Sequence, residues 1–392
     1  MLILVAGLVV ATLLVSVAGA VAFERRIPVL RRDEGEAPPP SVALLVPARD
    51  EEDVIEACLA SWLAQRDVQL EVRLIDDGSR DATVARARAV AGDDPRFQLL
   101  TAPPLPPGWF GKQAALAYGV RGVQSDWLLF VDADVRLEPD AARAAVDSAR
   151  RYGATFLSVW PHQRTDDPWV GRAQPWFVGL AAVGDALRRL WSPGYPHALS
   201  AWGSSILIER DAYERVGGHA RIRDRLHEDT ELAITFVRAG ETAVILDGRA
   251  HVDVSMYAGL RDLLRGWGKN LYASLGTNPV WAAAFALYLL LLGVAPSVVT
   301  VVAAWRGDGA ALALGAIALL LQGALGRAFA ERVEVPARRR WTAAGPLGAI
   351  LVVVVLGSSV ARAALGIGVR WKDRTYAAPG SRGAPSDDDP GG

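Results

Sequence analysis

The chain has 392 residues, 51% of them hydrophobic, and a mean hydropathy of +0.20, which is high for a soluble protein. Its 42 basic and 43 acidic residues nearly cancel, so no excess of positive charge points to a nucleic-acid-binding protein. The single cysteine, Cys58, excludes an internal disulfide and a cysteine-rich zinc site. Because Cys58 lies in the apolar pattern "VIEACLASWL", we expect a buried small side chain there.

The first 23 residues carry no charged side chain and predict a transmembrane anchor over 1–23. At 1.5 Å per residue such a helix can cross about 30 Å of hydrocarbon. A cleaved signal peptide is the alternative, because "AGA" at 18–20 resembles a cleavage site, but the basic n-region is missing. The segment "ERRIPVLRR" follows directly, and arginines on this side predict that the next domain faces the cytoplasm.

Three further apolar segments, at about 279–304, 309–328 and 343–363, predict a C-terminal membrane region over 279–365. The basic loop "RAFAERVEVPARRRW" should be cytoplasmic, and a third full span would then place "RWKDRTY" outside, against the positive-inside rule. Either the first segment, broken by Pro296, is not a simple span, or one segment lies in the membrane interface. Residues 378–392 are rich in Pro, Gly and Ser and predict a disordered tail.

The body of the chain, residues 40–275, alternates between two periodicities in its first half. Four strands are expected, at 41–46, 68–75, 97–100 and 127–131. Helical periodicity fills the intervals, at 51–65, 81–92 and 111–124. This alternation predicts an α/β fold with a parallel sheet between helices. Ligands of such sheets bind outside the carboxyl ends of the strands.

Acidic residues gather where these strands end, in "PARDEED", "DDGSRD" and "DAD". Some of these acids have an ordinary explanation, since Asp81 is a suitable helix cap. Capping does not explain the pairs Asp76–Asp77 and Asp132/Asp134, because clustered carboxylates repel one another. Mg²⁺ or Mn²⁺ prefers oxygen ligands and commonly uses one or two carboxylates together with substrate phosphates. The acids therefore predict a divalent metal that carries a phosphorylated ligand.

Five motifs occur in order: "VPARDEED", "IDDGSRDAT", "GKQAAL", "VDADV" and "HEDTELA". With them the chain resembles a membrane-bound family 2 glycosyltransferase of GT-A (Rossmann-like, nucleotide-sugar-binding) fold, over about residues 41–275. Within that family, it resembles in particular the carotenoid- and hopanoid-associated transferases. The resemblance implies a hexosyltransferase that moves one sugar, with inversion, from a nucleotide-diphosphate sugar, expected to be a UDP-sugar, to an isoprenoid or carotenoid-like lipid.

The resemblance also implies roles for particular residues. The donor nucleotide would be contacted by Pro47, Ala48, Arg49, Glu51, Asp76, Asp77, Lys112 and Asp132. Asp134 would hold the metal on the diphosphate, with Asp132 on the ribose or a metal-bound water. Some relatives have a further metal ligand shortly after this motif, where Arg136 stands nearby instead in this chain, and His251 is a weaker candidate for that role. The acceptor site would be formed by Gly203, Ser204 and Ser205, with Trp267 and Lys269 in the amphipathic segment 255–275.

Two interpretations remain open for the helix that begins near residue 226. Glu228 and Asp229 would complement the positive end of the helix dipole. By resemblance, Asp229 would instead be the general base, with Glu228 as the second candidate. With an ordinary aspartate pKa of about 3.9, Asp229 would already be ionised at neutral pH.

Two alternative functions also remain. Processive polysaccharide synthases of the same superfamily carry Gln-x-x-Arg-Trp in this region, where this chain has "RGWGKN", so the sequence disfavours chain building. A catalytically inactive membrane scaffold is the other alternative, and the intact acids at 132, 134 and 229 argue against it.

Overall fold

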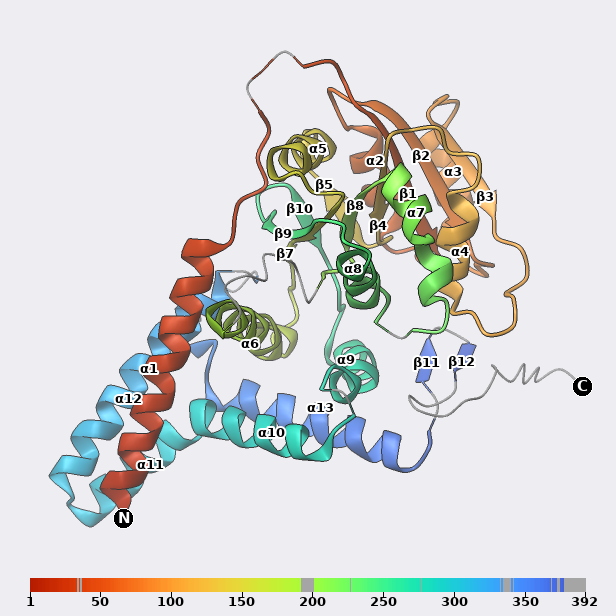
Figure 1. The fold of residues 1–392 in the computed structure, drawn as a ribbon. Coiled ribbons are helices and arrows are strands. Elements are labelled where there is room, and N and C mark those ends of the chain that lie inside the picture. Colours follow the sequence, from red (N-terminus) through yellow and green to blue (C-terminus); the bar gives the residue numbers. More distant parts are fainter. Residues whose placement is uncertain are drawn as a thin grey trace, which may run out of the picture. The chain divides into compact units, whose positions relative to one another are not determined.

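The structure is a computed structural model (Figure 1). It describes residues 1–33, 35, 37–191, 201–225, 227–275, 277–331, 333, 340, 342–367, 369–371 and 374–376. The predicted tail at 378–392 lies outside these ranges. The chain divides into two compact units. The helical unit comprises residues 1–26, 163–195 and 256–368, and the sheet unit comprises residues 27–162, 196–255 and 369–392.

The sheet unit is built around a seven-stranded sheet in the order β3-β2-β1-β4-β8-β6-β9. Its strands are β1 (Ser41–Ala48), β2 (Gln69–Asp76), β3 (Phe97–Thr101), β4 (Trp127–Val131), β6 (Phe156–Trp160), β8 (Ser205–Glu209) and β9 (Ala243–Asp247). The helices of this unit are α2 (Ile55–Leu63), α3 (Thr83–Ala91), α4 (Gly111–Gly119), α5 (Ala141–Tyr152), α7 (Arg210–Val216), the 3₁₀ helix η1 (Gly218–Ile222) and α8 (Glu228–Arg238).

The first four strands are parallel to one another, as the sequence predicts. β4 is buried along its whole length, which explains its unbroken run of apolar residues. The second half of the sheet is different, because β8 runs antiparallel to both β4 and β6. The prediction of a parallel sheet is therefore right for β1 to β4 and wrong for the complete sheet, while the α/β fold class is confirmed.

The reversed direction of β8 decides which residues meet. Val131, the last residue of β4, is paired with Ser205, the first residue of β8. Ala48 at the end of β1 is likewise paired with Asp76 at the end of β2. The carboxyl ends of three strands and the start of a fourth thus lie on one rim. A smaller sheet in the order β5-β10-β7 consists of β5 (Val135–Leu137), β10 (Val252–Val254) and β7 (His162–Gln163).

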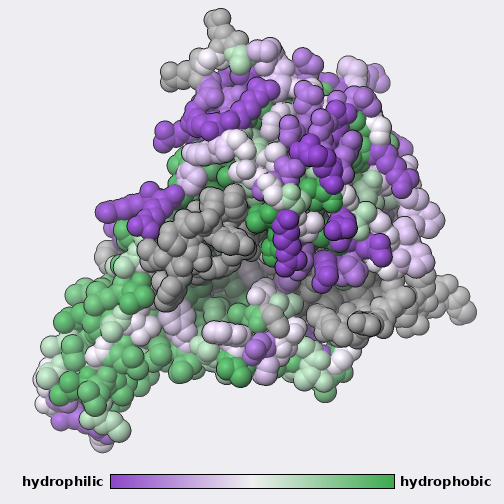
Figure 2. Space-filling view, in the orientation of Figure 1, coloured by the Kyte–Doolittle hydropathy of each residue, from purple (hydrophilic) through white to green (hydrophobic). Residues whose placement is uncertain are grey.

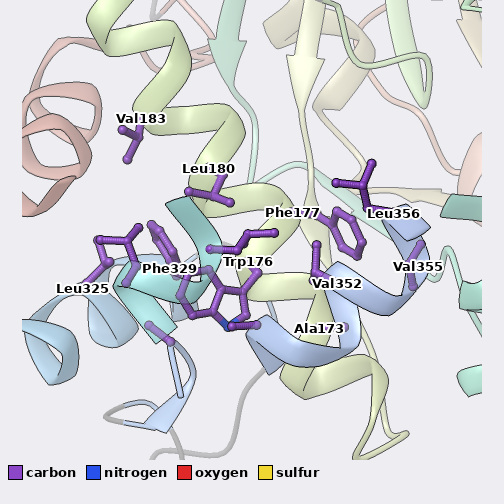
Figure 3. Packing of buried hydrophobic residues seen from close by; sticks show 14 of the residues in the cluster. Ala173, Trp176, Phe177, Leu180, Val183, Leu325, Phe329, Val352, Val355 and Leu356 are labelled. Carbon is purple, nitrogen blue, oxygen red and sulfur yellow. The ribbon is translucent and has the colours of Figure 1, made fainter. Parts of the chain in front are cut away.

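The helical unit contains α1 (Leu2–Arg26), α6 (Val170–Trp191), α9 (Leu260–Ser274), α10 (Pro279–Gly293), α11 (Ala295–Arg306), α12 (Gly309–Ala330) and α13 (Pro346–Ala364). Aromatic side chains hold it together (Figure 3). Trp176 meets Phe329 edge to face, with ring centroids 5.8 Å apart. Phe177 stacks on Trp267 at 3.9 Å. The remaining strands are β11 (Val369–Trp371) and β12 (Arg374–Tyr376), which form an antiparallel pair.

Three helices of the described chain, α1, α12 and α13, are long and apolar enough to cross a membrane. The pair α10 and α11 also passes this test together but bends by 52° between them, so the first C-terminal segment is broken. Apolar side chains cover the outer surface of α1, α11 and α12 (Figure 2), among them the exposed Leu4, Val301 and Leu320. Such a continuous apolar surface is typical of contact with lipid.

Candidate active site

A pocket in the sheet unit brings six of the predicted site residues together. It is lined by Pro47 of β1, Lys112 of α4, Asp132 after β4, Gly203 before β8, and Glu228 and Asp229 at the start of α8. These residues come from five separate segments of the chain. The strand pairing described above places Pro47, Asp132 and Gly203 on one rim of the sheet.

The ammonium of Lys112 lies between two carboxylates in this pocket. Its Nζ is 2.6 Å from Asp132 Oδ1 and 2.6 Å from Glu228 Oε1. Burial by itself lowers the pKa of Lys112, but the two carboxylates together raise it above its usual value. Lys112 therefore stays charged, and it joins the acid after β4 to the acid that opens α8.

Asp134 lies in a strongly negative environment. Burial, and then the negative charges of Asp132 and Glu51, raise its pKa to about 8. No group of three or more possible metal-binding side chains occurs in the described part of the chain. Mg²⁺ and Mn²⁺ do not need such a group, since one or two carboxylates with substrate phosphates suffice. An excess of negative charge at Asp132 and Asp134 fits this kind of ion.

The carboxylate of Asp229 is held by two backbone hydrogen bonds. Oδ2 accepts a bond from the Gly203 N–H at 2.9 Å, and Oδ1 accepts one from the Thr230 N–H at 2.7 Å. Burial, and then the charge of Glu228, raise its pKa to about 7. The expectation of an ordinary aspartate pKa is therefore wrong, because the sequence does not show the neighbours that surround this carboxyl group. An aspartate with a pKa near 7 is well matched to proton transfer at neutral pH.

The remaining predicted nucleotide residues lie at the ends of β1 and β2. The Arg49 guanidinium donates a hydrogen bond to the Asp77 carbonyl and is 4.0 Å from the Asp77 carboxylate. The Asp77 N–H donates to the Ala48 carbonyl at 2.9 Å, and Asp76 accepts a bond from the Ser79 N–H at 3.0 Å. The Glu51 N–H donates to the Thr83 hydroxyl. These bonds stabilise a connected rim of polar groups.

The predicted acceptor residues do not all lie in one unit. Ser204 and Ser205 are buried at the start of β8 beside Gly203, and the Ser204 carbonyl accepts a bond from the Asp132 N–H. Trp267 belongs to the helical unit, where it stacks on Phe177. Lys269 is a residue of α9, and the structure does not describe its side chain. His251, the weaker metal-ligand candidate, has its Nε2 3.7 Å from Asp140 Oδ2.

The sequence did not indicate the other residues of the pocket wall. These are Leu116, Phe130, Val131, Ile206, His219 and Leu232. His219 is buried, and its Nδ1 is 2.8 Å from the Tyr213 hydroxyl. Burial lowers the pKa of His219 to about 3, so its imidazole is neutral and serves as a wall of the pocket. A local sequence pattern cannot identify it, because its neighbours come from other elements. Cys58 is buried, as predicted.

Comparison with known proteins agrees with this geometry. Residues 43–217 match the family model for glycosyl transferase family 2. A 4,4'-diaponeurosporenoate glycosyltransferase of Staphylococcus haemolyticus is 27% identical over 260 residues, which cover 65% of this chain and 68% of the relative. The protein of the same name from Staphylococcus aureus (strain MRSA252) is 28% identical over 259 residues, which cover 64% and 66%. The matches thus span about two thirds of the relatives' length.

Among solved structures, a mannosyltransferase from Pyrobaculum calidifontis, determined with GDP-Man and Mn²⁺, has a TM-score of 0.55. It is 19% identical, and the match covers 92% of this chain and 98% of that one. This likeness supports the GT-A fold. Residues 43–217 thus match a family 2 glycosyltransferase domain, and the chain has the GT-A fold. Within this class, the chain is similar to the relatives named 4,4'-diaponeurosporenoate glycosyltransferase, in agreement with the predicted resemblance to carotenoid-associated transferases.

The first prediction concerns the ion pairs that Lys112 forms with Asp132 and Glu228. In Lys112→Met, Asp132 and Glu228 lose their shared cation, and the free energy of unfolding at neutral pH should fall by about 1–3 kcal/mol. Burial already raises the pKa of Asp132, and Lys112 opposes this effect of burial at both Asp132 and Glu228, so without Lys112 the pKa values of both carboxyl groups should rise. The folded protein then binds more protons than the unfolded one, so stability should recover as the pH is lowered. Chemical denaturation of the full chain in detergent at several pH values measures this.

The double variant Lys112→Met/Glu228→Gln is the matched control, because it removes the same cation together with one of the two charges. It should regain part of the lost stability at neutral pH. A loss in Lys112→Met that is the same at every pH, and that the second change does not relieve, would contradict the bridging role.

Proposed function

We propose that this protein is an inverting, metal-dependent glycosyltransferase that moves one sugar from a nucleotide-diphosphate sugar to a lipid acceptor in the membrane. The observation that carries the proposal is the pocket in which Asp132, Lys112 and Asp229 meet. The first two belong to the motifs that resemble a donor site, and the third is a carboxylate of raised pKa suited to activate an acceptor. The relatives named diaponeurosporenoate glycosyltransferase support a carotenoid-like acceptor.

In this proposal Asp229 is the general base. Inverting transfer needs a group that takes the proton of the acceptor oxygen while this oxygen bonds to the anomeric carbon. The bond between that carbon and the donor diphosphate breaks in the same displacement, and the diphosphate leaves with its electron pair. The Gly203 and Thr230 N–H groups fix the direction of the Asp229 carboxylate and leave lone pairs on both oxygens for the incoming proton.

The donor side of the pocket has two functions in the proposal. Arg49, Asp76 and Asp77 would bind the nucleoside, which we propose to be uridine on the basis of the resemblance. Asp134 and Asp132 would hold Mg²⁺ or Mn²⁺, which supplies charge stabilisation for the leaving diphosphate. Lys112 would contribute a second positive charge near the phosphates, because its ammonium already lies against Asp132.

We also propose that the protein is a multi-pass membrane protein whose sheet unit faces the cytoplasm. Arg25 and Arg26 lie in the last turn of α1, directly before Ile27, where the sheet unit begins. Basic residues at this end of α1 fit a cytoplasmic sheet unit under the positive-inside rule. Within the helical unit, α13 packs against α9, where the Ser359 hydroxyl accepts a bond from the Tyr272 N–H. α9 carries the exposed charged residues Arg261 and Arg265. A helix that lies beside these charges fits the membrane interface better than the hydrocarbon core.

This placement of α13 resolves the conflict with the positive-inside rule. α1 and α12 would cross the membrane, and the shorter α11 would lie in it packed against α12. α10 and α13 would lie side by side at the cytoplasmic surface, as their direction across α1 and α12 suggests (Figure 1). Both basic segments, before and after α13, are then cytoplasmic.

The first test of this function concerns Asp229. In Asp229→Asn the proton acceptor is removed while the shape and the hydrogen bond from Gly203 are retained. Single-turnover sugar transfer from radiolabelled nucleotide sugars to extracted membrane lipids should fall by about 10²- to 10⁴-fold. UDP affinity should not change. In the wild type, transfer should also decline as the pH falls through about 7, because the base is then protonated, and this decline should be absent in the variant.

Glu228→Gln is the comparison variant, since it changes the neighbouring acid and leaves Asp229 in place. Transfer by Asp229→Asn within about threefold of the wild type, with the acid decline still present, would remove Asp229 as the base.

The second test concerns the metal. In Asp134→Ala, Mn²⁺ should no longer strengthen UDP binding in calorimetry, and nucleotide-sugar turnover should be abolished, because the diphosphate loses its metal. Asp93→Ala removes an exposed acid from the same unit and should leave both properties unchanged. Turnover by Asp134→Ala that persists in the presence of a chelator would contradict the metal proposal.

The third test concerns topology. In a Cys58→Ala background, Arg306→Cys, at the end of α11 and shortly before α12, should react with a membrane-impermeant maleimide on intact cells. Leu365→Cys, directly after α13, should react only after permeabilisation, because α13 does not cross the membrane in this proposal. Reaction of Leu365→Cys on intact cells would show that α13 is a span.

A further inference from the structure

A groove lined by arginines lies in the sheet unit, between α7, η1 and α8. Five arginines line it: Arg215, Arg221, Arg223, Arg225 and Arg238. Two carboxylates, Asp224 and Glu231, accompany them, so positive charge is in excess. Hydrophilic side chains gather over these elements in Figure 2. The groove is separate from the residues to which the proposed reaction assigns a role.

Two of the five arginines have ion-pair partners. Arg215 is 2.9 Å from Glu241, and Arg225 is 3.7 Å from Asp224. Arg221, Arg223 and Arg238 are exposed and make no ion pair within the part of the chain that the structure describes. Three like charges on one groove repel one another, and an anion that binds there would remove this repulsion.

The segment that carries the arginines is held in place by its backbone. Ile222 is buried between Arg221 and Arg223. The Arg223 carbonyl accepts a hydrogen bond from the Phe110 N–H at 2.8 Å, and the Arg225 carbonyl accepts one from the Gln113 side chain at 2.6 Å. These contacts use the backbone and leave the side chains of Arg221 and Arg223 exposed. A fixed backbone reduces the entropy lost when such side chains bind a ligand.

Gly217 fixes the position of Arg221. It ends α7 with a φ of +89°, in the left-handed region that favours glycine. A Cβ at this position would lie 2.9 Å from the Arg221 side chain, so the aliphatic part of Arg221 packs over the glycine. Arg221 therefore packs against the turn at Gly217 and lines the groove.

Two different faces of helix α8 line the candidate active site and the arginine groove. Glu228, Asp229 and Leu232 line the candidate active site. Glu231, Thr235 and Arg238 line the groove at helical spacing. The groove is thus on the back of the helix that positions the proposed base.

We propose that this groove binds the phosphate group of an anionic phospholipid headgroup. A guanidinium offers paired N–H donors that match phosphate oxygens, and several arginines together can bind one phosphate from more than one side. The source of the phosphate follows from the apolar helices α1, α12 and α13, which suit a chain kept at a membrane, where anionic headgroups are abundant. The net charge of −1 does not favour a nucleic acid.

Native mass spectrometry of the full-length protein in a neutral detergent tests this proposal. The probes are short-chain phosphatidylglycerol, short-chain phosphatidylcholine as the zwitterionic comparison, and inorganic phosphate as competitor. The groove variant is Arg221→Ala/Arg223→Ala/Arg238→Ala. The matched control, Arg66→Ala/Arg88→Ala/Arg150→Ala, removes three exposed arginines of the same unit that lie outside the groove. Thermal unfolding confirms that each variant is folded.

The wild type should prefer phosphatidylglycerol over phosphatidylcholine. The groove variant should lose affinity for phosphatidylglycerol by at least about tenfold, the loss expected when several charge-assisted hydrogen bonds disappear together. The control should bind like the wild type. Equal binding by the groove variant and the wild type, or equal losses in both triple variants, would overturn the site. Groove-dependent binding of inorganic phosphate without a preference for phosphatidylglycerol would support the phosphate site and overturn the lipid as its source.

Discussion

The ammonium of Lys112 is the positive charge on which the arrangement of the site depends. The end of β4 and the start of α8 each bring a carboxylate to the same place, and without a cation between them these elements would repel one another. Because the pair is partly withdrawn from water, the attraction must offset a desolvation cost, which two short ion pairs to one lysine can do. The residue that holds the site together thus comes from a third element, α4.

The antiparallel strand β8 has a comparable importance for geometry. In a purely parallel sheet, every strand would start at the edge opposite to the site. β8 starts at the site instead, so Gly203 lies next to the end of β4 and its N–H reaches Asp229. In the first turn of α8, Asp229 accepts a bond from a backbone N–H at the positive end of the helix and also lines the pocket, so the two interpretations of this acid do not exclude each other.

The division into units follows packing rather than position along the chain. α6 and α9 lie within the segment that resembles a glycosyltransferase, yet they pack with the apolar helices. The reason is visible in their side chains: Trp176 and Phe177 of α6 find their partners in Phe329 of α12 and Trp267 of α9. A close approach accompanies these contacts, because a Cβ at Gly179 would lie 2.0 Å from the Phe329 ring. Aromatic packing of this kind joins α6 to α9 and α12, which lie far from it in the sequence.

The sequence by itself determined the elements whose signal is local. The expected strands at 41–46, 68–75, 97–100 and 127–131 correspond to β1 to β4, because buried strands and amphipathic helices differ in periodicity. The position of the acids at strand ends was also readable. Only the tertiary structure decided the direction of β8, the two partners of Lys112, the place of His219 in the pocket wall and the raised pKa of Asp229. Each of these depends on burial and charge contributed by distant segments, and no local pattern of residues records those contacts.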